Sequence, residues 1–505
     1  MDERLALYRP KSRENLSSFL VDCVDGSSRG STGPQIRSII DHLINLEVRA
    51  AVVQHDVQDP DFLAEHCTYY AQWAFSVPRY CKRIHFFSAD AVSDDVLEAI
   101  DAFSEKEDAY LGFLTLRPVA NSPVGATFLK KPPHSWHRFI RTYDEYPVNL
   151  GGRRFFVPAT PFMEQDNAVG ACAQASIWMA LRTLRWREGR SAFSPAEITT
   201  AATRFVVNGR TLPNRDGLRI DQITEAIRAA GYSPHVIPLR ASDDIINETE
   251  WPEQEHRKAC RLLYPYIESG IPVLLALLHP TGGHAVVAIG HGWTKMPTAT
   301  QPTHDENVGE ITVVDASRWA GPFIINNDNS GVYLDLPPGP NEGYSLSDAF
   351  CAIPLLSADI LVDAEEARNT CINLLANLAD SELKDSYLDL PGKLVTRTRL
   401  LSRSSFRREV VLGCMNPKLK RYYRQKWLPR HVWVMELSPV EGYEQSPDNG
   451  TPRLGEILLE PSADPKEAHF LAVRLNGLAL KEQPTTADLI VDRDAFSGNI
   501  RLDLL

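Results

Sequence analysis

A cysteine and a histidine lie in two short segments whose residue types suit nucleophilic chemistry. Cys172 begins a helical pattern shortly after Gly170, and His284 follows Gly282-Gly283 at the start of an apolar, strand-like run. A thiol becomes a useful nucleophile when neighbouring groups lower its pKa and an imidazole is placed to exchange its proton. The first turn of a helix favours the thiolate through the positive end of the helix dipole. The two segments therefore predict a thiol–imidazole pair.

The histidine needs a partner for its second ring nitrogen, and the sequence offers two. Asp315 ends the next strand-like run and would accept the ring N–H of His284, which would fix the tautomer of the imidazole. The polar stretch from Asn326 to Asp328 is the rival. Asp315 is the first choice, and the rival stretch stays open.

An oxyanion formed by nucleophilic attack needs N–H donors aimed at it. Gln165, seven positions before the cysteine, would donate from its side chain beside the backbone N–H of Cys172. Asn167 is the alternative donor. The predicted catalytic set is therefore Cys172 as nucleophile, His284 as base, Asp315 as orienting group and Gln165 as oxyanion donor.

These segments resemble the papain-like cysteine peptidases, and most closely the C39-like branch known from bacterial peptidases. The resemblance covers only about 200 residues in the centre of the chain, and it is carried by Gln165, by 170–176, by 283–290 and by 313–315. It implies an α+β fold with a papain-like core, in which the N-terminal helix carries the cysteine and an antiparallel sheet carries the histidine and aspartate. It also implies hydrolysis of a peptide or isopeptide bond, with a protein or peptide as substrate.

Other functions are compatible with the same residues. The Cys-His-Asp set can also serve an acyltransferase or a deamidase, because those reactions differ in the leaving group and the acceptor rather than in the nucleophile. A catalytically silent papain-like binding or regulatory protein is a further alternative. No metal-ligand pattern accompanies the histidines near position 284, and we expect neither a metal ion nor a cofactor.

The chain of 505 residues is too long for one core, and its patterns divide it into three regions. We expect an N-terminal accessory α/β domain at 1–150, a papain-like (C39-like) domain at 151–355 and a C-terminal accessory α+β domain at 356–505. Apolar periodicity predicts helices at 36–46, 94–103, 172–186, 221–230 and 364–379. Short β-rich runs predict strands at 110–116, 273–278, 285–289, 311–314, 323–325, 392–401, 431–437, 455–459 and 470–475.

The composition indicates a soluble protein of the cytoplasm. Eight scattered cysteines without a Cys-x-x-Cys pair suit reduced thiols, and no apolar run approaches the ~20 residues that span a bilayer. A net charge of −12 makes nucleic acid an unlikely partner of the whole surface. The basic, aromatic segment 418–430 is expected to be a solvated helix face or a dock for the acidic remainder, with nucleic-acid binding as the weaker reading. The accessory domains are possible sites for a partner protein.

Overall fold

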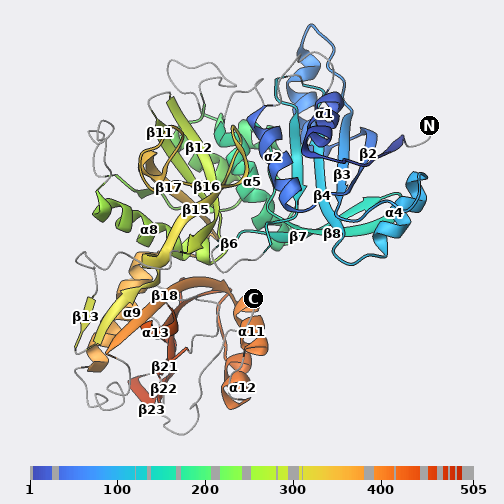
Figure 1. Ribbon diagram of the computed structural model, residues 1–505. Coiled ribbons are helices and arrows are strands. Elements are labelled where there is room, and N and C mark those ends of the chain that lie inside the picture. The colour runs from blue at the N-terminus through green and yellow to red at the C-terminus, as the bar shows by residue number, and fades with distance from the viewer. Residues whose placement is uncertain are drawn as a thin grey trace.

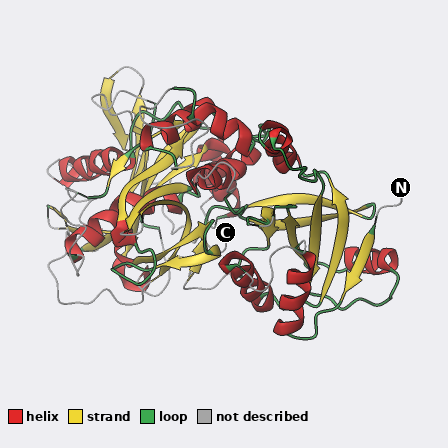
Figure 2. Cartoon of the chain, turned by 90° about the horizontal axis from the view of Figure 1, so that it is seen from above, coloured by secondary structure: helices red, strands yellow, loops and turns green. Residues whose placement is uncertain are grey.

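The computed structural model shows a mixed α+β protein with three larger sheets and one separate hairpin (Figures 1 and 2). The N-terminal, central and C-terminal sheets lie beside one another, with the C-terminal sheet at the bottom of Figure 1. The residues that the structure describes are 4–24, 33–119, 121–133, 138–165, 172–205, 217–240, 252–279, 282–293, 306–309, 311–379, 392–413, 417–443, 453–462, 470–475, 478–483 and 486–491.

The N-terminal sheet is antiparallel, and its strands follow one another in sequence order. Helix α2 packs against it because its apolar residues at 36, 39, 40 and 43 share one helix face and are buried. The helix predicted at 36–46, the helix predicted at 94–103 and the strand predicted at 110–116 are confirmed. The elements are β1 (Leu5–Tyr8), α1 (Arg13–Cys23), α2 (Pro34–Asn45), β2 (Ala50–Val57), α3 (Pro60–Thr68), β3 (Cys81–Phe87), α4 (Val96–Ser104), β4 (Tyr110–Leu116) and β5 (Val124–Leu129).

A two-stranded hairpin follows, at the place where the sequence suggested a domain boundary. Its turn residues Gly151 and Gly152 both have positive φ, at 54° and 81°, as a two-residue type I′ turn requires. The strands are β7 (Asp144–Leu150) and β8 (Arg153–Ala159). The predicted boundary at 150 falls inside this turn, and the domain limits stay a prediction.

The central sheet has the order β10-β17-β11-β12-β15-β16, with β6 on β12 and β9 on β17. Helix α5 lies against β12, where the Ser176 hydroxyl donates to the carbonyl of Ala285 at 2.9 Å. Its strands are β6 (Arg138–Ile140), β9 (Ser233–Pro234), β10 (Ile237–Pro238), β11 (Val273–His279), β12 (Gly282–Trp293), β15 (Ala320–Asn327), β16 (Gly331–Leu336) and β17 (Ala349–Leu356). Its helices are α5 (Cys172–Arg187), α6 (Pro195–Ala202), α7 (Ile220–Ala229) and α8 (Glu253–Glu268).

The C-terminal sheet has the order β13-β14-β18-β19-β20-β21-β22-β23, and β14 and β18 pair in parallel. The chain enters this sheet with β13 and β14, returns to the central sheet for β15 to β17, and then completes the C-terminal sheet. The strands are β13 (Glu306–Val308), β14 (Ile311–Asp315), β18 (Lys393–Ser402), β19 (His431–Pro439), β20 (Gly455–Leu459), β21 (Phe470–Leu475), β22 (Leu478–Gln483) and β23 (Thr486–Val491). The helices are α9 (Ala364–Ala379), α11 (Arg403–Leu412), α12 (Pro417–Gln425) and α13 (Val440–Tyr443).

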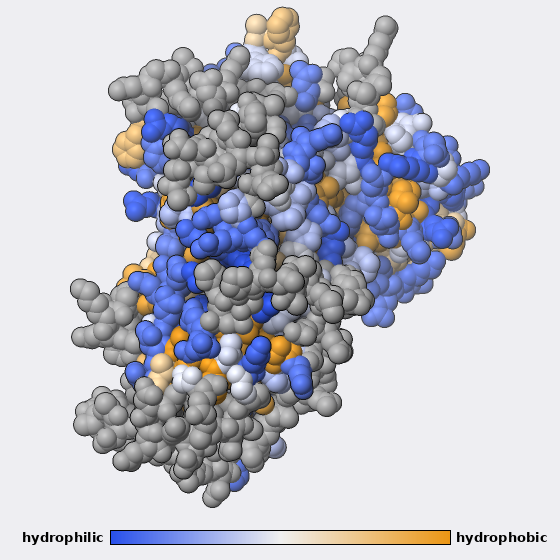
Figure 3. All heavy atoms as spheres, turned by 60° about the vertical axis from the view of Figure 1, so that its left-hand side comes forward, coloured by the Kyte–Doolittle hydropathy of each residue, from blue (hydrophilic) through white to orange (hydrophobic). Residues whose placement is uncertain are grey.

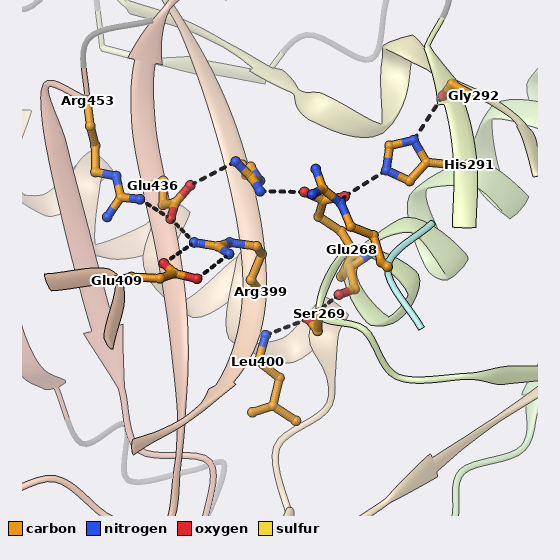
Figure 4. Close-up of polar contacts among 12 residues, drawn as sticks. Glu268, Ser269, His291, Gly292, Arg399, Leu400, Glu409, Glu436 and Arg453 are labelled. Carbon is orange, nitrogen blue, oxygen red and sulfur yellow. Dashed lines mark hydrogen bonds and ion pairs between the residues drawn. The ribbon is translucent and has the colours of Figure 1, made fainter. Parts of the chain in front are cut away.

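A buried network of charges joins the central and C-terminal sheets (Figure 4). Glu268, at the end of α8, accepts from Arg141 Nε at 3.0 Å, lies 2.6 Å from His291 Nε2 and accepts from Arg397. Arg397 in turn lies 3.6 Å from Glu436. Burial by itself raises the pKa of Glu268, but Arg141, Arg397 and His291 outweigh that effect and hold the pKa well below its usual value. The carboxylate is therefore ionised inside the protein.

The described surface on the face drawn in Figure 3 is mainly hydrophilic, with small separate hydrophobic areas. Among the described residues, no helix is both long enough and apolar enough to cross a membrane.

Candidate functional site

The predicted nucleophile lies at the first position of α5, against the strand that carries the predicted base. The thiol of Cys172 is half-buried, and the backbone of Ala285, the residue after His284, is near enough to oppose the rise in its pKa. Burial, and secondarily the nearby Asp328 carboxylate, raise the pKa of the Cys172 thiol to about 11. The structure thus brings Cys172 next to the residue that follows His284, while the pairing of the two side chains stays a prediction, and the thiol is protonated near neutral pH.

His284 is 5% exposed and held in one orientation by an amide. Its Nε2 lies 2.9 Å from Asn327 Oδ1. An amide oxygen only accepts, so Nε2 carries the hydrogen and Nδ1 has the free electron pair. Asn329 Nδ2 lies 3.4 Å from Nδ1, and the Tyr344 ring stacks on the imidazole with centroids 4.5 Å apart. Burial lowers the pKa of His284 although the Asn327 hydrogen bond opposes the shift, which favours the neutral ring.

The prediction that Asp315 orients His284 is wrong. Asp315 ends β14, which belongs to the C-terminal sheet, and its carboxylate accepts from Arg368 Nε and from the Ser317 backbone N–H, both at 2.9 Å. Asn327 ends β15, the direct neighbour of β12 in the central sheet, and therefore reaches the imidazole. The rival stretch that the sequence offered supplies the orienting group.

The next residue of that stretch adds a buried carboxyl group to the site. Asp328 is fully buried, and its Oδ1 lies 3.6 Å from His284 Nε2. Backbone N–H groups of Asp328 and Asn329 approach the carboxyl, but within the described residues neither oxygen has a hydrogen bond of normal geometry. Burial raises the pKa of Asp328 well above its usual value, and the Glu164 carboxylate adds to this shift. The protonated, uncharged form of Asp328 is therefore favoured. Burial, rather than a charge on Asp328, is then the main reason why the pKa of Cys172 is raised.

The oxyanion donor stays a prediction. Gln165 is half-buried and ends the described segment before α5, while Asn167 lies outside the described residues. No hydrogen bond joins the Gln165 side chain to Cys172 or His284 within the described part of the chain. Sequence reasoning also missed Tyr344, because nothing in the loop after β16 indicates that it returns to His284.

The described residues contain no group of three or more His, Cys, Asp or Glu side chains arranged to hold a metal ion. The arrangement at His284 is that of a neutral base with a fixed tautomer, next to a protonated thiol and a protonated carboxyl. Such a site can accept one proton at Nδ1 and can donate from the thiol.

No family model matches the chain. Curated proteins with similar sequences include histidinol dehydrogenases of Legionella pneumophila strain Lens, 21% identical over 157 residues, and of strain Philadelphia 1, 22% identical over 142 residues. They also include the histidinol dehydrogenase of Oceanobacillus iheyensis, 24% identical over 208 residues. The matches cover 31%, 28% and 40% of this chain and 36%, 33% and 45% of the relatives. The chain thus spans between a third and a half of the length of these relatives.

These similarities contradict the prediction of a cysteine peptidase or other thiol hydrolase, since the curated relatives are dehydrogenases. The pKa shifts at the site also disfavour a cysteine peptidase. A Cys–His peptidase relies on a thiolate beside an imidazolium, whereas burial raises the pKa of Cys172 and lowers that of His284. At this identity and coverage, a dehydrogenase-related activity is a proposal for the present chain.

The raised pKa gives a direct expectation for thiol reactivity. Iodoacetamide should label Cys172 at pH 7 at least tenfold more slowly than the exposed Cys67, because only the thiolate reacts and Cys172 is protonated below about pH 11. The rate should rise about tenfold per pH unit over the alkaline range. Peptide mass spectrometry at timed intervals measures both rates. Rapid labelling of Cys172 at pH 7 that disappears in His284→Ala would contradict the conclusion that Cys172 is a protonated thiol.

Proposed function

We propose that the chain has a dehydrogenase-related function and that a small alcohol binds beside His284. The observation that carries the proposal is the similarity to three curated histidinol dehydrogenases. Oxidation of an alcohol transfers a hydroxyl proton to a base and a hydride to an acceptor, which a nicotinamide dinucleotide or another oxidant from solution would have to supply, and a neutral imidazole suits the first of these transfers. The fixed tautomer of His284 supports this role, because Nδ1 is the unprotonated nitrogen.

Each residue of the site has a stated part in this proposal. Nδ1 of His284 accepts the hydroxyl proton, and Asn327 holds the ring while the imidazolium exists, since its amide oxygen accepts from Nε2–H in both states. The protonated Cys172 and Asp328 groups add hydrogen-bond donors near the base without adding charge. The stacked Tyr344 ring keeps one face of the imidazole away from water.

The hydride acceptor of a dehydrogenase is commonly a nicotinamide dinucleotide, which supplies the redox chemistry when bound. The residues of this chain do not fit the usual cradle for that group. The sequence has no Gly-x-Gly-x-x-Gly segment, and β14 with β18 is the only parallel pair among the described strands. No step through a nicotinamide is therefore derived from the structure.

The test is a direct assay of the full chain with histidinol as the alcohol. Absorbance at 340 nm reports the reduced nicotinamide when NAD or NADP is supplied, and a tetrazolium dye reports reducing equivalents when another acceptor is used. We expect colour or absorbance to increase in proportion to protein concentration. Absence of reduction with histidinol and with a panel of amino alcohols, under both readouts, would contradict the proposal.

Two other expectations belong with this proposal. The papain-like arrangement of the central region stays a prediction of fold, supported by the cysteine at the start of α5 and the histidine on β12. A cytoplasmic location is supported by the seven described cysteines, which are free thiols. The predicted protein or peptide substrate loses its basis together with the peptidase activity, while a partner protein on the flanking regions stays a prediction.

A further inference from the structure

Helices α11 and α12 and the segment after them concentrate positive charge on an acidic protein. Residues 403–430 contain nine lysines and arginines and one acid, which gives +8, whereas the whole chain carries −12. The exposed cations define a surface that we call the basic surface, made of Arg403, Arg408, Lys418, Arg421, Arg424 and Arg430. Both helices lie to the right of the C-terminal sheet in the lower half of Figure 1.

The helices that carry the basic surface are fixed to the protein. Leu419 and Tyr423, one helical turn apart on α12, are buried in a core with Phe406 of α11. The ammonium group of Lys420 donates to the carbonyl of Val411 at 3.0 Å, which ties α12 to α11. The remaining positions of α12 therefore point outward on a rigid support.

Within the described residues, few acidic side chains pair with the arginines of the basic surface. Arg430 lies 3.5 Å from Glu188. Glu409, the acid within the segment, is held by both terminal nitrogens of Arg399 at 2.9 and 2.8 Å. In the described part of the chain, no ion pair joins Arg403, Arg408, Arg421 or Arg424 to an acidic side chain.

The same basic segment contains an exposed aromatic side chain. Trp427 is 68% exposed, and in the sequence it follows Lys426 and precedes the basic surface residue Arg430 by three positions. The ammonium group of Lys426 lies 5.6 Å from the centre of the half-buried Tyr422 ring. An exposed indole in a segment rich in arginine offers a flat face on which a base can stack.

We propose that the basic surface binds the phosphate backbone of a single-stranded nucleic acid and that Trp427 stacks on one of its bases. Five of the six exposed cations are arginines, whose planar guanidinium groups bind phosphate in a bidentate manner. A membrane is the weaker fit, because the exposed side chains of the basic surface are charged and a helix that binds in a bilayer interface needs a continuous apolar face.

The experiment is fluorescence anisotropy of a labelled 20-nucleotide oligothymidine with the full chain at 20–300 mM salt. If about four phosphates are contacted, the slope of log affinity against log salt should be about −3. The double variant R421E/R424E should weaken binding at least tenfold, and W427A should weaken it about 5- to 150-fold. The control K106E/R204E changes the net charge equally at exposed positions of other regions and should leave the affinity unchanged.

Circular dichroism melts of all variants establish that the fold is retained, and W427A serves where the double charge reversal impairs folding. Three results would overturn the proposal. The first is no binding to the oligonucleotide at 20 mM salt. The second is an equal loss of affinity in K106E/R204E. The third is binding to vesicles of phosphatidylserine and phosphatidylcholine with none to the oligonucleotide, which would assign the surface to a membrane.

Discussion

Replacing Glu268 by alanine should lower the free energy of unfolding by about 3–5 kcal/mol. Glu268 is buried and bonds to Arg141, His291 and Arg397 (Figure 4), and its removal takes from Arg141 the carboxylate that it bonds to and leaves Arg397 with Glu436 alone, at 3.6 Å. Urea denaturation followed by tryptophan fluorescence measures the change. The loss of stability is large because buried arginines that have lost a partner are costly, in addition to the loss of the attraction itself.

A matched control removes a carboxylate from an ion pair at the surface. Glu365 bonds to Arg261 at 2.7 Å, and both side chains are substantially exposed to solvent. Glu365→Ala should therefore cost at most about 1 kcal/mol. Equal losses in the two variants would show that the buried network does not hold the two sheets together. A smaller loss in Glu268→Gln than in Glu268→Ala is also expected, since the amide still fills the space and accepts a hydrogen bond.

Replacing His284 by asparagine should reduce the proposed alcohol oxidation about 10²- to 10⁴-fold, the usual contribution of a positioned general base. The variant removes the nitrogen that accepts the proton while it keeps a polar side chain against Asn327. The same reduction assay with histidinol measures the rate. His235→Asn, on a half-exposed histidine that pairs with Asp363, is the control and should leave the rate unchanged.

The pH dependence of the rate distinguishes a base from a merely structural histidine. Burial lowers the pKa of His284 below its ordinary value of 6.5. The reactive neutral form therefore predominates at pH 6.5 and is lost as the pH falls through the lowered pKa. An acid limb with its midpoint above 6.5, or one that persists in His284→Asn, would contradict the role of His284.

Local patterns identified most of the elements that form the central sheet and its helices. The run at 172–186 has its apolar residues on one helix face, and the structure forms α5 over Cys172–Arg187. The strand expected at 285–289 is the middle of a longer strand, β12, because its pairing with β11 begins at Gly282 and its buried residues continue to Trp293. Such elements are predictable because burial of a regular face depends on residues close together in sequence.

The choice between Asp315 and Asn327 could not be made from the sequence. Both residues end strands, and both side chains can accept from an imidazole N–H. The outcome depends on which sheet each strand joins, and β14 pairs with β18, a strand about 80 residues later in the chain. Long-range pairing of this kind has no local signal. The same reason explains why Tyr344 was missed.

The parallel pairing of β14 with β18 also bears on how the protein is made. A ribosome synthesises β14 before the central sheet is complete and supplies β18 only about 80 residues later. At typical rates of synthesis the hydrogen-bonding edge of β14 facing β18 stays unpaired on the order of 4–16 s. An unpaired strand edge is a template for association with other chains. The nascent protein is therefore exposed to aggregation between the synthesis of these two strands, and chaperones would be useful during that interval.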